Sequence, residues 1–207
     1  MRRTGIVLVF LAVFFAPSAA AQPEVSVRGN VGAAFFQSPE GLNNVLNSGV
    51  NLGLGAGVQL YGGLELVLQG GYDRFTLNGD NIALLEQGLN VGSKVEGGDL
   101  DVLNGTIGLR YTLEAQGDVH PYVSGGVGLY RTVLAETIIH QSDQVLPERG
   151  TTGRGFHVAI GSNFRIDDTY AFFFEPRLVI VDTQGSELDT STPTRYVTFL
   201  LGVDVLL

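Results

Sequence analysis

The chain of 207 residues contains no cysteine, which excludes disulfide bonds, thiolate metal sites and thiol nucleophiles. Basic residues are also scarce, with 12 Lys and Arg against 21 Asp and Glu and a net charge of −9. A surface of that sign argues against nucleic acid as a partner and offers no basic patch for anionic lipid. Only His120, His140 and His157 are histidines, and none has a second histidine at metal-ligand spacing. We therefore expect no metal site and no cofactor.

Long apolar runs are absent except at the N-terminus. Residues 5–16 form an apolar run between a basic start, Arg2 and Arg3, and the small-residue stretch SAAAQ. This layout predicts a secretory signal peptide, residues 1–21, cleaved after Ala21. A membrane anchor helix is the alternative, but a span needs about 20 apolar residues and this run is shorter. Residues 22–207 then form one domain, and the loss of two arginines changes its net charge from −9 to −11.

Alternation between apolar and small or polar residues runs through the remainder of the chain. In NLGLGAGVQL, residues 51–60, every second residue is aliphatic or alanine, and glycine dominates the positions between. A period of two predicts β-strands. The same test predicts eight strands, each near the ~9–11 residues with which a tilted strand crosses a bilayer. They span residues 25–35, 50–60, 64–73, 103–113, 123–130, 156–165, 170–180 and 197–207.

The connections between these expected strands alternate in length. Three are tight turns, carried by YGG, EAQGD and IDD, and four are long, at residues 37–49, 78–99, 137–153 and 183–193. Short turns at one end and long loops at the other are typical of up-and-down outer-membrane barrels. An even number of strands returns both ends of the chain to the periplasm, so we expect the long loops outside the cell.

The competing fold is a soluble sandwich or lipocalin-like barrel with its apolar face inward. However, the polar face of the strands is rich in Gly, Asn and Thr and poor in Lys and Glu, which suits a narrow lumen better than a solvated surface. We therefore predict an all-β fold, an eight-stranded antiparallel up-and-down transmembrane β-barrel. Its glycines would face the lumen and leave room there for longer side chains from other strands.

Aromatic residues near the strand ends support this choice, because membrane barrels carry two aromatic girdles. Tyr61, Tyr122 and Tyr196 share the parity of the lumen face, so the alternative to a girdle position is that they close the ends of the lumen. Near the turns lie Tyr61, Tyr111, Tyr122, Phe164 and Tyr170, and near the loops lie Phe35, Tyr72, Phe75, Phe156 and Tyr196.

The segment HPYVSGGVGLYR, residues 120–131, follows GTIGLRYTL, residues 105–113. A Pro-Tyr pair that opens a glycine-alternating strand resembles the outer-membrane protein β-barrel family, small barrels related to the OmpA transmembrane domain and the opacity adhesins. The resemblance implies a location in the outer membrane among its lipid and lipopolysaccharide, and insertion by the outer-membrane assembly machinery. One position departs from the family, whose chains usually end on an aromatic residue, because the last residue here is Leu207.

Charged residues of both signs fall on the lumen parity. We expect two ion pairs between adjacent strands toward the periplasmic end, Glu65 with Arg110 and Arg28 with Asp204. Buried charges persist only when paired and hydrogen-bonded, so we predict a salt-bridged plug. A gated, narrow ion path lined by the same residues is the alternative. The full set is Arg28, Glu65, Asp73, Arg110, Arg165, Glu175, Arg177 and Asp204, with Glu175 and Arg177 nearer mid-height.

Three other features have open interpretations. Pro176 lies within a strand, where it removes a ladder hydrogen bond, and we expect a local bulge there. The acidic segment 78–101 could bind calcium but matches no ligand spacing, so a solvated loop is the simpler interpretation. Within it, residues 82–91 are apolar and suggest a short capping helix or an interaction surface. Residues 136–146 are a second such surface, or strands extended beyond the membrane.

The chain offers little for catalysis. HQS, residues 140–142, superficially resembles the His-x-Ser pair of outer-membrane lipid A deacylases, but it lies in a loop without a positioned third group. We therefore predict no catalytic residues and no enzyme. We expect a monomer with a structural or surface-interaction role, in membrane integrity or in adhesion of a surface ligand through the long extracellular loops. A narrow porin-like channel for ions or small solutes is the alternative, and a lipid-modifying enzyme the third possibility.

Overall fold

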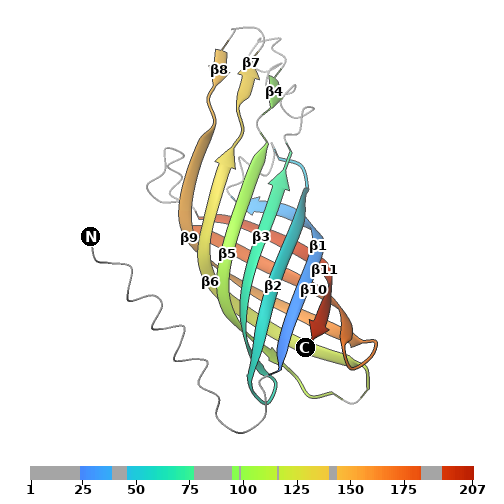
Figure 1. Cartoon of the computed structure of the whole chain (residues 1–207). Coiled ribbons are helices and arrows are strands. Elements are labelled where there is room, and N and C mark those ends of the chain that lie inside the picture. Colours follow the sequence, from blue (N-terminus) through green and yellow to red (C-terminus); the bar gives the residue numbers. More distant parts are fainter. Residues whose placement is uncertain are drawn as a thin grey trace, which may run out of the picture.

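The computed structural model describes residues 24–38, 46–76, 95–97, 99–115, 117–139, 144–182 and 193–207. Within these ranges, eight long strands form a closed barrel and three short strands form a second sheet (Figure 1). The predicted fold class is confirmed. No helix in these ranges is long and apolar enough to cross a membrane. The predicted signal peptide, HQS and residues 82–91 lie outside the described residues.

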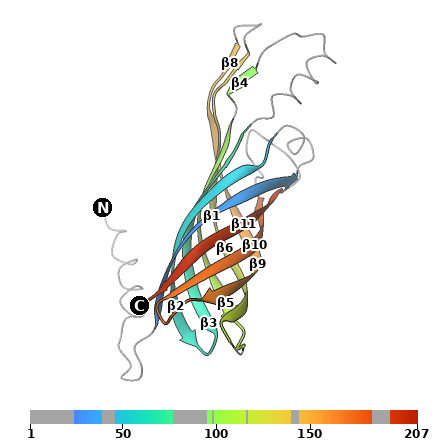
Figure 2. The same ribbon diagram turned by 90° about the vertical axis from the view of Figure 1, so that its right-hand side faces the viewer.

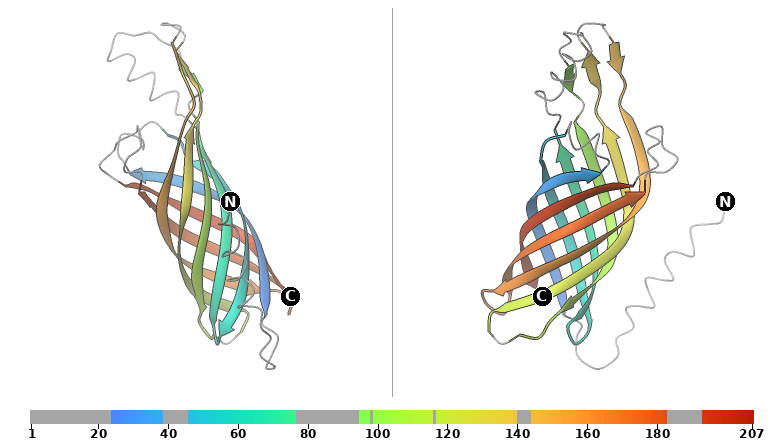
Figure 3. Two further views of the ribbon diagram at one scale, coloured as in Figure 1. Left: turned by 60° about the vertical axis from the view of Figure 1, so that its left-hand side comes forward. Right: turned by 180° about the vertical axis from the view of Figure 1, so that it is seen from behind.

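Each barrel strand pairs antiparallel with its neighbours, and β1 closes the barrel on β11, in the order β1-β11-β10-β9-β6-β5-β3-β2. Two views from other sides show how strongly the strands tilt around the barrel (Figure 3). The barrel strands are β1 (Val25–Ser38), β2 (Gly49–Tyr61), β3 (Leu64–Phe75), β5 (Leu100–Thr112), β6 (Val119–Leu134), β9 (Arg149–Arg165), β10 (Tyr170–Asp182) and β11 (Thr194–Leu206).

The small sheet stands beyond one end of the barrel (Figures 1 and 2). Its strands are β4 (Val95–Gly97), β7 (Thr137–Ile139) and β8 (Gln144–Leu146), with β7 in the middle. β7 follows β6 after two residues, and β8 precedes β9 by two, so this sheet prolongs the β6–β9 pair. Residues 137–139 and 144–146 are therefore strands that extend beyond the barrel, which is one of the two interpretations of residues 136–146.

The tight turns lie at the opposite end of the barrel, as does the C-terminus (Figure 1). Gly62 and Gly117 have φ of +53° and +96°, a backbone region that other residues rarely adopt, and each sits in one of these turns. In the third turn, Asp167 Oδ1 accepts hydrogen bonds from the backbone N–H groups of Thr169 at 2.8 Å and Tyr170 at 2.7 Å. The three turns therefore have local causes in the sequence.

Most aliphatic side chains of the barrel strands point outward, and the buried charged side chains lie in the lumen. Leu54, between two glycines on β2, is 73% exposed, whereas Asp73 on the neighbouring strand is 1% exposed. Val50, Val127 and Ile160 are likewise exposed on the outer wall. This arrangement is the reverse of a soluble barrel and suits a wall surrounded by lipid.

The aromatic girdles are only partly as predicted. Outward positions near the strand ends are occupied by Phe35, Tyr111, Phe164 and Tyr170, whereas Phe156 points outward from the middle of β9. Three expected girdle residues, Phe75, Tyr122 and Tyr196, are instead buried in the lumen. Tyr122 and Tyr196 follow the alternative that their parity allowed, whereas the girdle assignment of Phe75 was wrong because it shares the parity of Asp73. Tyr61 is exposed beside the β2–β3 turn.

Pro176 does not produce the expected bulge. Its pairing with Phe199 of β11 keeps the register of the whole β10–β11 ladder. On the other side, the β9 register is the same before and after the proline, from Phe174 opposite Ser162 to Arg177 opposite Ala159. The missing N–H thus interrupts the ladder toward β9 locally without inserting a residue.

Candidate functional site: the polar lumen

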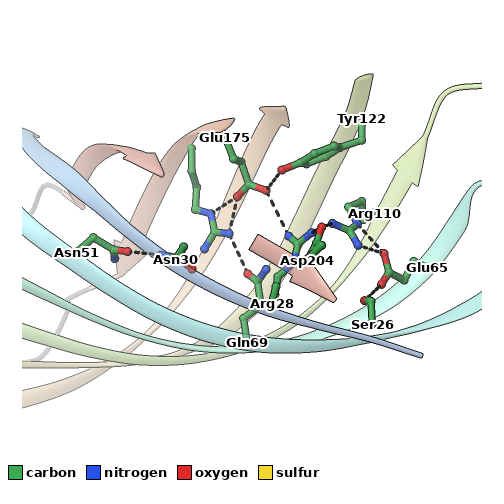
Figure 4. Close-up of polar contacts among 11 residues, drawn as sticks. Ser26, Arg28, Asn30, Asn51, Glu65, Gln69, Arg110, Tyr122, Glu175 and Asp204 are labelled. Atoms are coloured by element: carbon green, nitrogen blue, oxygen red, sulfur yellow. Dashed lines mark hydrogen bonds and ion pairs between the residues drawn. The ribbon is translucent and has the colours of Figure 1, made fainter. Parts of the chain in front are cut away.

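Six charged side chains meet inside the barrel and alternate in sign along a continuous chain of contacts (Figure 4). The order of the chain is Glu65, Arg110, Asp204, Arg28, Glu175 and Arg177. The first five are each at most 5% exposed. Because three carboxylates face three guanidinium groups, the charges cancel within the chain.

The two ion pairs expected from adjacent strands are both present. Arg110 Nε donates to Glu65 Oε2 at 2.6 Å, and Ser26 Oγ donates to Glu65 Oε1 at 2.5 Å. Arg28 holds Asp204 by two hydrogen bonds, from Nε to Oδ1 at 3.0 Å and from the terminal nitrogen to Oδ2 at 2.7 Å. A two-point contact of this kind fixes both side chains as well as neutralising them.

Other contacts cross the lumen between strands that do not touch. Arg110 on β5 also donates to Asp204 Oδ2 on β11 at 3.0 Å, although these strands lie on opposite walls. Arg177 on β10 likewise reaches Gln69 Oε1 on β3 at 2.9 Å, while donating to Glu175 Oε1 at 2.8 Å through Nε. Such bridges fill the cross-section, because each spans the diameter of the barrel.

Aromatic rings cover the guanidinium groups. Tyr122 donates its hydroxyl to Glu175 Oε2 at 2.8 Å, and the Arg110 guanidinium lies 5.3 Å from the centre of the same ring. Arg28 lies 4.7 Å from the centre of Phe173. These are cation–π distances, so the rings stabilise the buried cations as well as excluding water.

The glycines of β2 leave space for this network. A Cβ on Gly57 would collide with the carboxylate of Glu65 and come within 2.6 Å of Ser26 Oγ. One on Gly55 would come within 3.0 Å of the side chains of Arg28 and Gln69. Glycine therefore recurs along this strand because neighbouring side chains occupy the space in front of it, as the alternation predicts.

Asp73 forms a second cluster on the loop side, with amide and hydroxyl partners. Asn51 Nδ2 donates to Asp73 Oδ1 at 2.6 Å, and Tyr196 Oη donates to Oδ2 at 3.1 Å. Asn104 approaches Oδ2 at 3.4 Å, and Asn30 donates to Asn51 at 2.7 Å. No cation lies within 4.0 Å of this carboxylate among the described residues. Asp73 thus stands apart from the six-residue chain.

The two ends of the lumen differ. Toward the loops an apolar cluster closes it, in which Phe75 contacts Phe36 and Tyr196 edge-to-face at ring-centre distances of 5.3 and 5.6 Å. Toward the turns, a cleft of about 340 Å³ opens and reaches Glu65, Arg110 and Asp204. The charged chain therefore lies between the open cleft on the turn side and the apolar cluster that closes the loop side.

Like Asp73, Arg165 is a predicted site residue that the structure does not bring into the network. It is exposed at the rim of the turn-side cleft, and no ion pair joins it to the chain of charges among the described residues. Its parity was correct, but it is the last residue of β9, where the lumen opens. Ser26, Gln69, Tyr122 and the asparagines were not predicted as site residues, although their parity already placed several of them on the polar face.

The remaining chemical candidates are dispersed. His157 is buried at mid-lumen and His120 lines the turn-side cleft. Asp99 and Asp101 of the acidic segment contact Arg74 and Tyr72 at the loop-side rim. Among the residues that the structure describes, no group of three or more His, Asp or Glu could hold a metal ion.

Comparison with known proteins agrees with this geometry. Residues 6–204 match the model of the family described as outer membrane protein beta-barrel domain. The chain belongs to this family. It is therefore an outer-membrane β-barrel, as the resemblance of residues 105–131 implied.

Solved structures of other outer-membrane barrels share the fold. Neisserial surface protein A is 17% identical with a TM-score of 0.58, over 87% of this chain and 96% of that protein. OprG of Pseudomonas aeruginosa is 12% identical with a TM-score of 0.53, over 89% and 96%. Ail, the attachment invasion locus protein of Yersinia pestis, is 10% identical with a TM-score of 0.51, over 90% and 100%. No curated protein sequence matches the chain. At these identities the similarity establishes the fold alone.

Proposed function

We propose that this outer-membrane barrel is a structural protein with a closed interior, which acts in membrane integrity or adhesion through its extracellular surface. The observation that carries the proposal is the filled lumen. Charges bridge its full diameter, as from Arg110 to Asp204, and an apolar cluster around Phe75 closes the loop side. A solute path would have to break both, and opening either exposes buried charge or apolar surface.

The sheet beyond the barrel supports an outward role. β4, β7 and β8 lie at the end opposite the turns and prolong two barrel strands past the rest of the wall (Figure 2). If the turns face the periplasm, this sheet is held away from the membrane by the extended β6 and β9 strands. A surface so presented suits contact with a partner outside the cell. The proposal includes export by residues 1–21, insertion by the assembly machinery, surrounding lipid and lipopolysaccharide, and a monomeric state without catalytic function.

The proposal is tested by shortening the extension. Replacing residues 137–146 by a two-residue Asn-Gly turn should leave the barrel folded, because that turn suits a hairpin and the barrel ladders are untouched. Cells producing the intact chain, the shortened chain or neither are compared for sedimentation, which reports contact between cells, and for uptake of a hydrophobic dye, which reports membrane integrity.

Either outcome that separates the strains identifies the role. Slower sedimentation of both the shortened strain and the strain without the protein supports adhesion through the extension, and higher dye uptake only without the protein supports a role in integrity. If all three strains behave alike in both assays, while a gel-mobility shift shows both chains folded, the proposal is wrong.

A narrow channel is the second candidate, because the turn-side cleft already reaches the charged chain. The cleft of about 340 Å³ leaves Glu65, Arg110 and Asp204 as the barrier between the mouth and mid-lumen. A rearrangement of these pairs would lengthen the path. Conduction through the refolded protein separates this candidate from a closed barrel.

A further inference from the structure

The carboxylate of Asp73 is the uncompensated charge of the lumen. The buried and half-buried charges of the described lumen are the three guanidinium groups of the network and four carboxylates, its three and Asp73. The net charge of the interior is therefore −1. An isolated charge in a medium of low dielectric constant is strongly unfavourable unless something neutralises it.

The hydrogen bonds around Asp73 suit an ionised carboxylate. Both of its oxygens accept: Oδ1 accepts from Asn51, and Oδ2 accepts from Tyr196 and more weakly from Asn104. The amide of Asn30 donates to Asn51, so the donors of the cluster point toward Asp73. This arrangement stabilises the anion but supplies no positive charge.

A small cavity adjoins this carboxylate. Its volume is about 20 Å³, enough for one occupant the size of a water molecule, since such a site needs roughly 10–15 Å³. Oxygen-bearing side chains surround it: Asp73, Asn30, Asn51, Asn104, Gln69, Tyr130, Tyr196 and Thr198. Thr198 is 2% exposed, and its hydroxyl has no hydrogen-bond partner, although it lines the cavity. A buried polar atom without a partner is destabilising, so this hydroxyl indicates an occupant.

The charge environment indicates the kind of occupant. Arg177 also lines the cavity, and its hydrogen bonds among the described residues, from Nε and one terminal nitrogen, go to Glu175 and Gln69. A divalent ion would exceed the single uncompensated charge and would face this guanidinium. A monovalent ion balances the interior, and carboxylate, amide and hydroxyl oxygens are suitable ligands for a hard cation.

We propose that the cavity between Asp73 and Thr198 binds one monovalent cation of the size of Na⁺. The site goes beyond the proposed function and holds whether the extension serves adhesion or the protein serves integrity. The apolar cluster above and the charged chain below enclose it, so the ion enters as the barrel folds. Bound there, it couples the β3 wall, which carries Asp73, to β11, which carries Thr198.

Refolding in different salts tests the site. The protein is refolded from urea into detergent in NaCl or in choline chloride of equal ionic strength, and unfolding is followed by circular dichroism. Because an ion that binds only the folded state stabilises it, the unfolding midpoint should rise with Na⁺ and saturate. Choline is too large for the cavity and should give no such rise.

Variants separate the site from a general effect of salt. Asp73→Asn should abolish the difference between the two salts, and Thr198→Val should weaken the Na⁺ dependence at least tenfold. Ser124→Ala is the matched control, because Ser124 also carries a buried hydroxyl without a partner but lines another lumen cavity. It should keep the wild-type Na⁺ dependence. If Asp73→Asn fails to fold, the comparison of Thr198→Val with Ser124→Ala decides the question.

A crystal structure at high resolution gives a direct measurement, since Na⁺ lies closer to its oxygen ligands than a hydrogen-bonded water molecule lies to its partners. The proposal predicts such short contacts from the occupant to the oxygens of Asp73 and Thr198. Equal midpoints in the two salts, an unchanged Na⁺ dependence in Thr198→Val, or an occupant at ordinary hydrogen-bond distances would overturn it in favour of a water molecule. Saturable stabilisation by Ca²⁺ but not by Na⁺ would overturn the monovalent assignment.

Discussion

Replacing Glu65 by alanine removes one end of the chain of lumen charges. The carboxylate is 5% exposed and accepts from Ser26 at 2.5 Å and from Arg110 at 2.6 Å. Breaking a buried ion pair by removing one partner costs about 3–5 kcal/mol, because the other charge remains buried. Arg110 keeps its bond to Asp204 at 3.0 Å and the ring of Tyr122 at 5.3 Å. We therefore expect the lower value, about 3 kcal/mol, or roughly a 100-fold change in the unfolding equilibrium.

The assay is equilibrium unfolding by urea in detergent. The chain has no tryptophan, so circular dichroism and the gel-mobility shift report the folded fraction. Arg165→Ala is the control, because this exposed arginine has no ion pair to the network and surface substitutions usually change stability by less than about 0.5 kcal/mol. If Glu65→Ala costs no more than Arg165→Ala, the charged chain does not stabilise the barrel.

A double mutant tests the pair itself. Glu65→Ala combined with Arg110→Ala removes both charges, and Asp204 keeps its two-point contact with Arg28. The double variant should be more stable than the sum of the single effects predicts, by about 1–3 kcal/mol, since contacting residues couple. Strict additivity would show that the two side chains act independently and would refute the reasoning.

Three further predictions follow from the packing of the lumen, each checked by the same urea titration. Gly57→Ala should destabilise the barrel by about 1–3 kcal/mol because its Cβ would collide with Glu65, whereas Gly105→Ala, with open space in front of it, should be nearly neutral. Tyr122→Phe removes a hydrogen bond to a charged partner and should cost about 1.5–3 kcal/mol. Phe75→Ala should cost about 3–5 kcal/mol through the cavity that it leaves in the apolar cluster. Wild-type midpoints for Tyr122→Phe or Phe75→Ala, or equal effects of the two glycine changes, would contradict these assignments.

Much of the fold was accessible from the sequence, because a period of two is a direct consequence of strand geometry. Parity alone placed Arg28 and Asp73 inside and Leu54 outside. Consecutive strands of an up-and-down barrel are neighbours, and the last strand closes on the first. The order of the strands along the chain therefore predicted the ion pairs between β3 and β5 and between β1 and β11. Phe75 shares the parity of Asp73, but its place near a strand end led to the wrong girdle assignment.

The contacts across the lumen could not be predicted. The parity of a residue fixes the face of the sheet on which its side chain lies. It does not fix the height of that residue relative to the opposite wall, which depends on the stagger of the whole barrel. The bridge from Arg110 to Asp204 joins strands four positions apart and has no signature in either segment. The asparagine environment of Asp73 and the exposure of Arg165 depend on the same heights. Pro176 shows a different limit, because a ladder can lose a hydrogen bond without changing register.

The most direct test of the closed lumen is the conductance of the refolded protein in a planar bilayer. The gel-mobility shift shows first that the inserted protein is folded. We predict a silent bilayer for the wild-type barrel, since bridges such as that from Arg110 to Asp204 fill the cross-section. Discrete and reproducible openings that change in size when Arg177 or Glu175 is replaced would contradict this prediction and establish a narrow channel.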